Sequence, residues 1–375
     1  MKSWIHYNKG ITPKQAHVDL PDGIKEEEVG RGGFLGPVAE LYRKNEPTGW
    51  TRVEGDWAPG DVDGTKIDAE DRTDPRGNPT LCFHNEDINI LISRRTDPMP
   101  YYYRDTDFDT MFFIHKGEGT LETEFGPLAF APGDYLIIPK GITYRVVPST
   151  KTNYLLKMES RHAINLVDFN QLGRHNPYDP TVIVTPEPTP IEADDQKEWE
   201  VRVRRDGEFT SFFYPNHPID TVGWKGDLFP FRFHNKDFRP VTADRNHIPP
   251  SAFGLFQGEG FWVCNFVPHP AQMEKGVLRL PYYHRNVDYD EIGFLHAGTM
   301  GGNPIEDASI MWHPRGATHG PGEEARAGAD AAWDDFKEHD IQAVNIDTEK
   351  PLKVTEVCRA AMRDQVQLIT GKAGE

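Results

Sequence analysis

Short apolar runs bounded by turn residues dominate the hydrophobic pattern of this chain. Runs of about four to eight residues between Gly, Pro and Asp are typical of β-strands. The clearest strand-like segments are residues 88–94, 121–125, 135–138 and 261–267. Helical patterns are confined to residues 330–338 and 355–368. The pattern therefore predicts an all-β fold that ends in a short helical C-terminal tail.

Two parts of the chain repeat each other. Residues 100–117 and 281–298 are identical at nine of eighteen positions. A second pair of matching segments, residues 139–144 and 314–319, follows in the same order. Two matched blocks in one order indicate a domain that is present twice. Because each copy is rich in short strands, we expect two jelly-roll-like β-sandwich domains.

The repeat also sets the expected domain boundaries. Residues 176–200 are rich in proline and charge, which favours an extended segment between the copies. We therefore expect an N-terminal domain over residues 1–165, a linker or strap over 166–220, a C-terminal domain over 221–345 and a tail over 346–375.

Charge and cysteine usage exclude several classes of function. Lys and Arg number 41 against 59 Asp and Glu, which gives a net charge of −18. Such an acidic surface repels phosphate backbones and anionic lipids, so we expect neither nucleic acid nor membrane as a partner. The three cysteines are isolated, which argues against a disulfide framework or a cysteine-based zinc site. With no long apolar segment and no apolar signal core after Met1, we expect a cytoplasmic protein.

The two copies differ in residues that can bind a metal. The second copy carries His284, Glu291 and His319. Their counterparts in the first copy are Tyr103, Thr110 and Tyr144. Two imidazoles and one carboxylate form a facial triad suited to Fe(II) and O₂, because coordination positions stay open for substrate and oxygen. We therefore expect one metal site, in the C-terminal domain. Mn(II) would fit the same ligands.

The spacing of these residues resembles the cupin superfamily. Two segments match the cores of its two motifs, namely His284-x-Asn286-x4-Glu291-x6-Gly298, with Asn in place of a second His, and Pro314-x-Gly316-x2-His319. The resemblance implies a bicupin, with a three-ligand site where other cupins have four ligands.

One rival to the carboxylate ligand stands beside it. Asp290 could replace Glu291 as the ligand, but Glu291 sets the cupin spacing, and Asp290 has a twin, Asp109, in the metal-free copy. By the same reasoning His115 and His296, which occur in both copies, are expected to be structural.

A closer resemblance is to homogentisate 1,2-dioxygenase. The residues that carry it are PYYHRN at 281–286, Glu291, His313, His319-Gly320-Pro321 and, upstream, residues 222–226 and His247. It covers residues 220–321 well and the N-terminal half in outline. The resemblance implies that His284, Glu291 and His319 bind Fe(II). It also implies that His247 and His313 lie beside the substrate, where one or the other would accept its phenol proton, and that Tyr282 lines the pocket. The same resemblance implies a homo-oligomer, a trimer or a hexamer.

The activity that this resemblance implies is Fe(II)-dependent cleavage of a hydroquinone-type aromatic ring, with both atoms of O₂ inserted. Homogentisate, opened to maleylacetoacetate in tyrosine degradation, is the leading substrate. The family's Arg and Tyr that hold the acetate group are absent, and Ala297 and Met300 stand near those places. Gentisate or a substituted hydroquinone is therefore an alternative. A different class also stays open, a non-oxidative metal-binding bicupin that is an isomerase or a ligand-binding protein.

Overall fold

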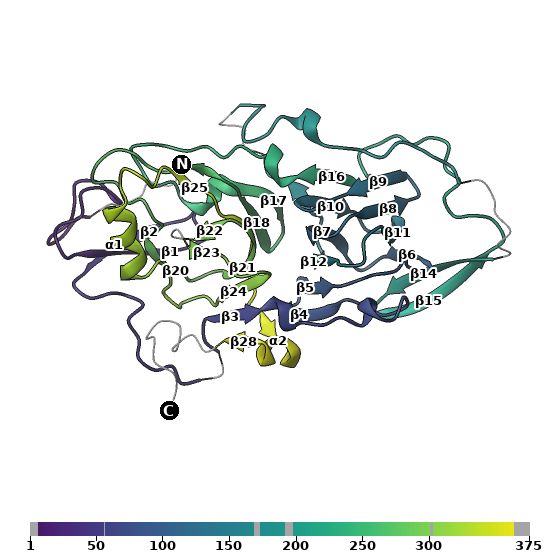
Figure 1. Cartoon of the computed structure of the whole chain (residues 1–375), viewed down its shortest axis with the longest axis horizontal. Coiled ribbons are helices and arrows are strands. Elements are labelled where there is room, and N and C mark those ends of the chain that lie inside the picture. The colour runs from purple at the N-terminus through teal and green to yellow at the C-terminus, as the bar shows by residue number, and fades with distance from the viewer. Residues whose placement is uncertain (1–6, 56, 169–172, 192–197, 301–302, 364–375) are drawn as a thin grey trace.

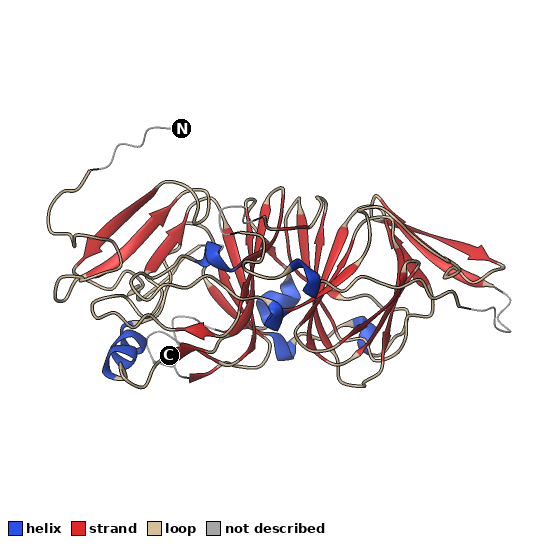
Figure 2. Cartoon of the chain, turned by 90° about the horizontal axis from the view of Figure 1, so that it is seen from above, coloured by secondary structure: helices blue, strands red, loops and turns tan. Residues whose placement is uncertain are grey.

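The chain forms two β-sandwiches that lie side by side along the long axis of the molecule (Figure 1). The computed structural model describes residues 7–55, 57–168, 173–191, 198–300 and 303–363. Strands make up nearly all of the regular structure (Figure 2). The all-β bicupin fold expected from the sequence is thereby confirmed. Among the described residues, no helix is both long and apolar enough to cross a membrane.

The first sandwich consists of a seven-stranded and a six-stranded sheet. The first of these sheets has the order β16 (Phe231–His234), β10 (Asp134–Ile138), β7 (Asp109–Lys116), β12 (Tyr154–Ser160), β5 (Ile88–Ser93), β4 (Thr80–His84) and β27 (Lys353–Val354). The other has the order β15 (Glu208–Tyr214), β14 (Trp199–Arg205), β6 (Tyr102–Asp105), β11 (Thr143–Pro148), β8 (Gly119–Thr123) and β9 (Gly126–Phe130).

The second sandwich pairs an eight-stranded sheet with a three-stranded one. The large sheet has the order β13 (Asn165–Leu166), β17 (Gly254–Gly258), β18 (Phe261–Phe266), β26 (Gln342–Thr348), β21 (Asp290–Ala297), β24 (Ser309–His313), β3 (Gly60–Asp63) and β28 (Met362–Arg363). The small sheet has the order β2 (Val38–Arg43), β1 (Lys25–Gly30) and β20 (Tyr283–Asn286). Two further pairs join β19 (His269–Pro270) to β25 (Glu338–His339) and β22 (Thr299–Met300) to β23 (Asn303–Pro304).

The duplication is preserved at the level of strands. Strands β20 and β21 begin and end 181 residues after β6 and β7, the offset of the first sequence repeat. Three of the four strand-like segments form β5, β10 and β18. The fourth, residues 121–125, begins within β8, which ends at Thr123 and turns into β9.

The two sandwiches share one hydrophobic core. Phe113 on β7 and Phe294 on β21 belong to the same buried cluster, and their ring centroids lie 6.3 Å apart. Beside them the two duplicated histidines meet, with Nδ1 of His115 3.0 Å from Nδ1 of His296. Burial is the main cause that lowers the pKa of both rings, that of His296 to about 4. The structural role expected for this pair therefore fits its position between the copies.

Strand pairing crosses the domain boundaries expected from the sequence. Strands β1 and β3, from the first 63 residues, pair with β20 and β24 of the second sandwich. Strand β16 pairs with β10 of the first sandwich, and β27 pairs with β4. The segment 166–220 contains the β14–β15 hairpin, which extends a sheet of the first sandwich. The division at residues 165, 220 and 345 stays a proposal.

The helices differ from those expected. The expected helix over 330–338 is wrong in position, because α1 spans Glu323–Ala331 and the chain then turns into β25. Its sequence, EEARAGADA, contains four alanines, the residue with the highest helix propensity. The helix expected over 355–368 is wrong in length, because α2 spans only Glu356–Ala360 and β28 follows at Met362. At its start the Thr355 side chain accepts a hydrogen bond from the amide of Cys358. Residues 364–368 lie outside the described part of the chain.

Candidate metal centre

Three side chains converge inside the second sandwich. His284 projects from β20 and Glu291 from β21, while His319 follows β24 in the chain. One ligand atom of each lies within 4.8 Å of the others. All three are largely shielded, with His284 9% and Glu291 5% exposed and the side chain of His319 11% exposed. The structure thus brings together the three residues that the sequence comparison singled out.

Backbone hydrogen bonds hold the two histidines next to each other. The amide of His284 donates to the carbonyl of His319, and the amide of His319 donates to the carbonyl of His284, both at 2.9 Å. Each ring then places its Nδ1 3.2 Å from a backbone carbonyl, of Tyr282 for His284 and of Ala317 for His319. A carbonyl can only accept, so Nδ1 carries the proton and Nε2 is left with a lone pair in the neutral ring.

The arrangement suits a cation bound between these side chains. Nε2 of His319 lies 3.1 Å and Nε2 of His284 3.8 Å from the same carboxylate oxygen, Oε2 of Glu291. If both rings are neutral, the lone pairs of their Nε2 atoms face the lone pairs of the Glu291 carboxylate. A metal ion or a proton between them removes this repulsion. The buried atoms His284 Nε2 and Glu291 Oε1 have no hydrogen-bond partner. Two imidazoles and one carboxylate are a donor set that suits Fe(II) or Mn(II).

Electrostatics support the same interpretation. Burial alone would raise the pKa of Glu291, but the imidazoles of His319 and His284 outweigh it and hold that pKa well below its usual value. Burial would lower the pKa of His284, yet the nearby carboxylate of Glu291 raises it overall. Glu291 is therefore an anion whose charge is available to a bound cation.

The rival carboxylate has a different role. Oδ1 of Asp290 accepts from the amide of Arg315 at 2.9 Å, and Oδ2 accepts from the amide of Leu352 at 2.7 Å. Its twin Asp109 does the same for the amides of Lys140 and Ile164. Both aspartates therefore hold loops in place, which agrees with the preference for Glu291.

The remaining expected site residues lie at different distances from the centre. The ring of His313, cross-strand from Glu291, stacks on His319 with centroids 3.9 Å apart. Tyr282 lies next, its ring centroid 5.8 Å from that of His284. His247 contacts Tyr282 at 5.9 Å and lies near a second group of histidines, including His17 and His339.

Neither expected proton acceptor titrates near neutrality in this environment. Burial is the main cause that lowers the pKa of His247 to about 3 and that of His313 well below its ordinary value. Both rings are therefore neutral at physiological pH, with a free lone pair available to accept a proton.

Several residues of the site were missed by sequence reasoning. Asp347 on β26 pairs with Glu291 across the sheet, and burial, followed by the charge of Glu291, raises the pKa of Asp347 well above its usual value. The ring of Phe34 meets His284 edge-on at 5.2 Å. Glu27 on β1 accepts from the hydroxyl of Thr318 at 2.7 Å, next to His319. Asp347 could have been found from its counterpart Glu159, but the N-terminal residues carry no such signal.

In the first sandwich, a lysine side chain lies in the region that corresponds to the candidate metal centre. Tyr103 and Tyr144, the counterparts of the two histidines, pair across the strands with ring centroids 5.6 Å apart. Nζ of Lys157 lies 5.8 Å from the Tyr103 ring and donates to Oε1 of Glu159 at 2.6 Å. A cavity of about 240 Å³ lies among these residues. An ammonium group that is part of the chain thus provides positive charge inside this copy.

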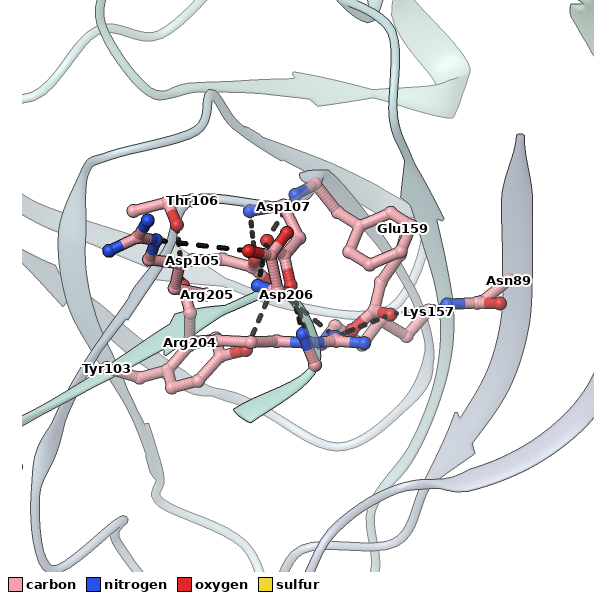
Figure 3. Close-up of polar contacts among 12 residues, drawn as sticks. Asn89, Tyr103, Asp105, Thr106, Asp107, Lys157, Glu159, Arg204, Arg205 and Asp206 are labelled. Carbon is pink, nitrogen blue, oxygen red and sulfur yellow. Dashed lines mark hydrogen bonds and ion pairs between the residues drawn. The ribbon is translucent and has the colours of Figure 1, made fainter. Parts of the chain in front are cut away.

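This network also includes a residue from the segment between the repeats. Arg204 on β14 donates to Oε2 of Glu159 at 3.0 Å and lies 3.5 Å from Oδ2 of Asp105 (Figure 3). Burial alone would raise the pKa of Glu159, but Lys157 and Arg204 lower it to about 2. The buried carboxylate is therefore fully paired without a metal ion.

Comparison with known proteins supports the relationship suggested by the motifs. The family model described as the N-terminal part of homogentisate 1,2-dioxygenase matches residues 81–235. The match lies on the half of the chain where the motifs showed the resemblance only in outline.

Comparison with whole curated proteins also finds dioxygenases of this kind. A protein of Saccharolobus solfataricus, whose name as a dioxygenase is provisional, is 29% identical over 94% of this chain and 95% of its own length. The homogentisate 1,2-dioxygenase of Nitrobacter hamburgensis is 29% identical over 63% of this chain, and that of Drosophila melanogaster 26% over 59%. These two matches span about half of the relatives, 54% and 51% of their lengths. The chain is thus similar to the homogentisate 1,2-dioxygenase family, in the N-terminal family model and in its curated relatives.

Proposed function

We propose that this protein is an Fe(II)-dependent dioxygenase that cleaves a hydroquinone-type aromatic ring, with homogentisate as the leading substrate. The observation that carries the proposal is the convergence of two imidazole Nε2 atoms on one carboxylate in a shielded site. The family relationship supports the reaction class.

His284, Glu291 and His319 would hold the metal. When bound, the metal would supply a Lewis acid and a template that holds O₂ and the substrate side by side. The hydrogen bonds from each Nδ1 to a backbone carbonyl keep both rings oriented toward the centre. Asp347, whose pKa is raised by burial, lies cross-strand from Glu291.

His313 is the stronger of the two proposed proton acceptors. Its ring stacks on His319, so a substrate hydroxyl at the centre would lie close to it. A neutral imidazole can take the proton from that hydroxyl as the phenol becomes a phenolate. His247 contacts Tyr282, and we propose that it positions that wall of the pocket.

A second substrate class is favoured by one observation. Near the places where the family holds the acetate group, this chain has Ala297 at the end of β21 and Met300, which is 45% exposed. Neither side chain can pair with a carboxylate. Gentisate or a substituted hydroquinone therefore stands as the alternative substrate.

Oxygen uptake by anaerobically iron-loaded protein tests the proposal. We expect stoichiometric O₂ consumption with one member of a panel of homogentisate, gentisate and hydroquinone, together with a new ultraviolet band of the ring-opened product. His284→Ala removes a ligand and should abolish both iron binding and turnover. Asp290→Asn, which changes a carboxylate next to Glu291 but not the proposed ligand set, should keep iron. Activity in iron-free His284→Ala protein, or turnover without O₂ consumption, would refute the proposal.

A further inference from the structure

A second group of buried acidic side chains lies on the β1–β2 hairpin. Glu26 and Glu28 are two residues apart on β1, so they point to the same face of the strand. Glu40 on β2 is paired with Glu28 in the strand register. Glu26 is 2% and Glu28 7% exposed, and Glu40 is partly buried. Three carboxyl groups are thus concentrated on one largely shielded face.

A histidine completes this group. Nδ1 of His17 lies 2.5 Å from Oε1 of Glu26, and the amide of His17 lies 3.1 Å from both oxygens of the same carboxylate. Ligand atoms of His17, Glu26 and Glu40 all lie within 4.8 Å of one another. This geometry is comparable to that of the His284 centre, with which it shares no residue.

A buried tyrosine with an unpartnered hydroxyl packs against this group. The Tyr282 ring stacks on His17 with centroids 4.2 Å apart, and Tyr282 is 2% exposed. Its buried hydroxyl has no hydrogen-bond partner, and neither has Oε2 of Glu40. Burial raises the pKa of that hydroxyl, and the nearby Glu28, Glu40 and Glu26 raise it further. Two buried oxygen atoms are therefore left available to a ligand.

Two nearby arginines pair with a different carboxylate, Glu27. Arg43 donates to Glu27, and Arg285 lies 3.6 Å from Glu27, which points to the opposite face of β1. Burial and the neighbouring Glu28 and Glu26 raise the pKa of Glu40 to about 9. Without a cation, Glu40 must therefore hold a proton at neutral pH.

We propose that His17, Glu26 and Glu40 bind a second divalent cation, beside the Tyr282 ring that stacks on His17. Two carboxylates and one imidazole suit Mn(II), Fe(II) or Zn(II) better than Ca(II), which prefers oxygen ligands throughout. Because Tyr282 also contacts His284, a cation here would fix one wall of the candidate active site. This inference does not depend on the proposed function.

Titration of metal-free protein with Mn(II), with free Mn(II) followed by electron paramagnetic resonance, tests the inference. We expect two bound ions per chain in the wild type, one in Glu40→Gln, one in His284→Ala and none in the double variant. Asp288→Asn removes an exposed carboxylate that pairs with Arg31 near the end of β1, and should keep two. Gln at position 40 imitates a protonated Glu40, so the variant should fold, which circular dichroism would check.

Thermal unfolding gives a second measurement that needs no activity. Mn(II) should raise the melting temperature of His284→Ala but not that of His284→Ala combined with Glu40→Gln. One ion in the wild type and none in folded His284→Ala would refute the second site and leave the first intact. One ion that His284→Ala keeps and Glu40→Gln loses would refute the first site and support the second.

Discussion

At the scale of single residues, the two copies differ in how they neutralise buried carboxylates. In the first, Lys157 and Arg204 pair with Glu159. In the second, the corresponding carboxyl, Asp347, has Asn345 as its hydrogen-bond donor and adjoins the anionic Glu291. The first copy thus neutralises its buried carboxylate with cationic side chains, whereas the second copy has a site that a bound cation could fill.

The residue-scale prediction concerns His313. His313→Ala should keep iron, because the three proposed ligands are untouched, but should lower kcat by about 100-fold or more through loss of the proton acceptor. Metal analysis and steady-state oxygen uptake over a range of pH would measure the two effects separately. An iron-free variant, or one with unchanged kcat, would contradict the assignment.

At the scale of elements, β1 joins the N-terminal residues to the site. It pairs in parallel with β20, which carries His284, and Glu27 on β1 contacts Arg43, Arg285 and Thr318. The strand therefore supports the segments that position both histidines.

The element-scale prediction is that Glu27→Gln lowers the free energy of unfolding by about 2 kcal/mol, since charged hydrogen bonds to a buried carboxylate are lost. Metal affinity should fall as well, because Thr318 precedes His319. Urea denaturation and metal titration would check this. Glu54→Gln, whose partner Arg52 is also exposed, is the control and should change stability by less than about 0.5 kcal/mol. Equal stabilities for the two variants would contradict the role given to β1.

The elements also show how far the sequence could predict the structure. The duplication placed β20 and β21 correctly and identified the three converging side chains, because aligned copies reveal which residues were exchanged. The run Lys25-Glu26-Glu27-Glu28 has the composition of a solvated surface, and its burial depends on partners more than 200 residues away. The β14–β15 hairpin was missed although Trp199, Val201 and Val203 alternate with charged residues along β14, because the proline-rich residues before it favoured a linker.

At the scale of the whole molecule, the shared core makes stability depend on pH. The pKa of His296 is about 4 in the folded protein and about 6.5 in an unfolded chain. Below pH 6.5 the unfolded chain therefore binds a proton that the folded chain does not, and stability is lost as the pH falls from 6.5 toward 4.

We expect His296→Asn to weaken this pH dependence, because it removes the titrating ring between the sandwiches. Other buried histidines should leave part of the dependence in place. Urea unfolding at several pH values would measure it, with His175→Asn, an exposed histidine, as the control. An unchanged slope in His296→Asn would show that this ring does not contribute.

The exchange of strands between the sandwiches has a consequence for synthesis on the ribosome. Strands β1 and β3 are made first but pair with β20 and β24, which follow more than 200 residues later in the chain. Strand β4 of the first sandwich likewise pairs with β27, which comes from residues 353–354. Neither half can complete its sheets during translation, so the early strands must stay unpaired, or be held by a chaperone, until nearly the whole chain has emerged.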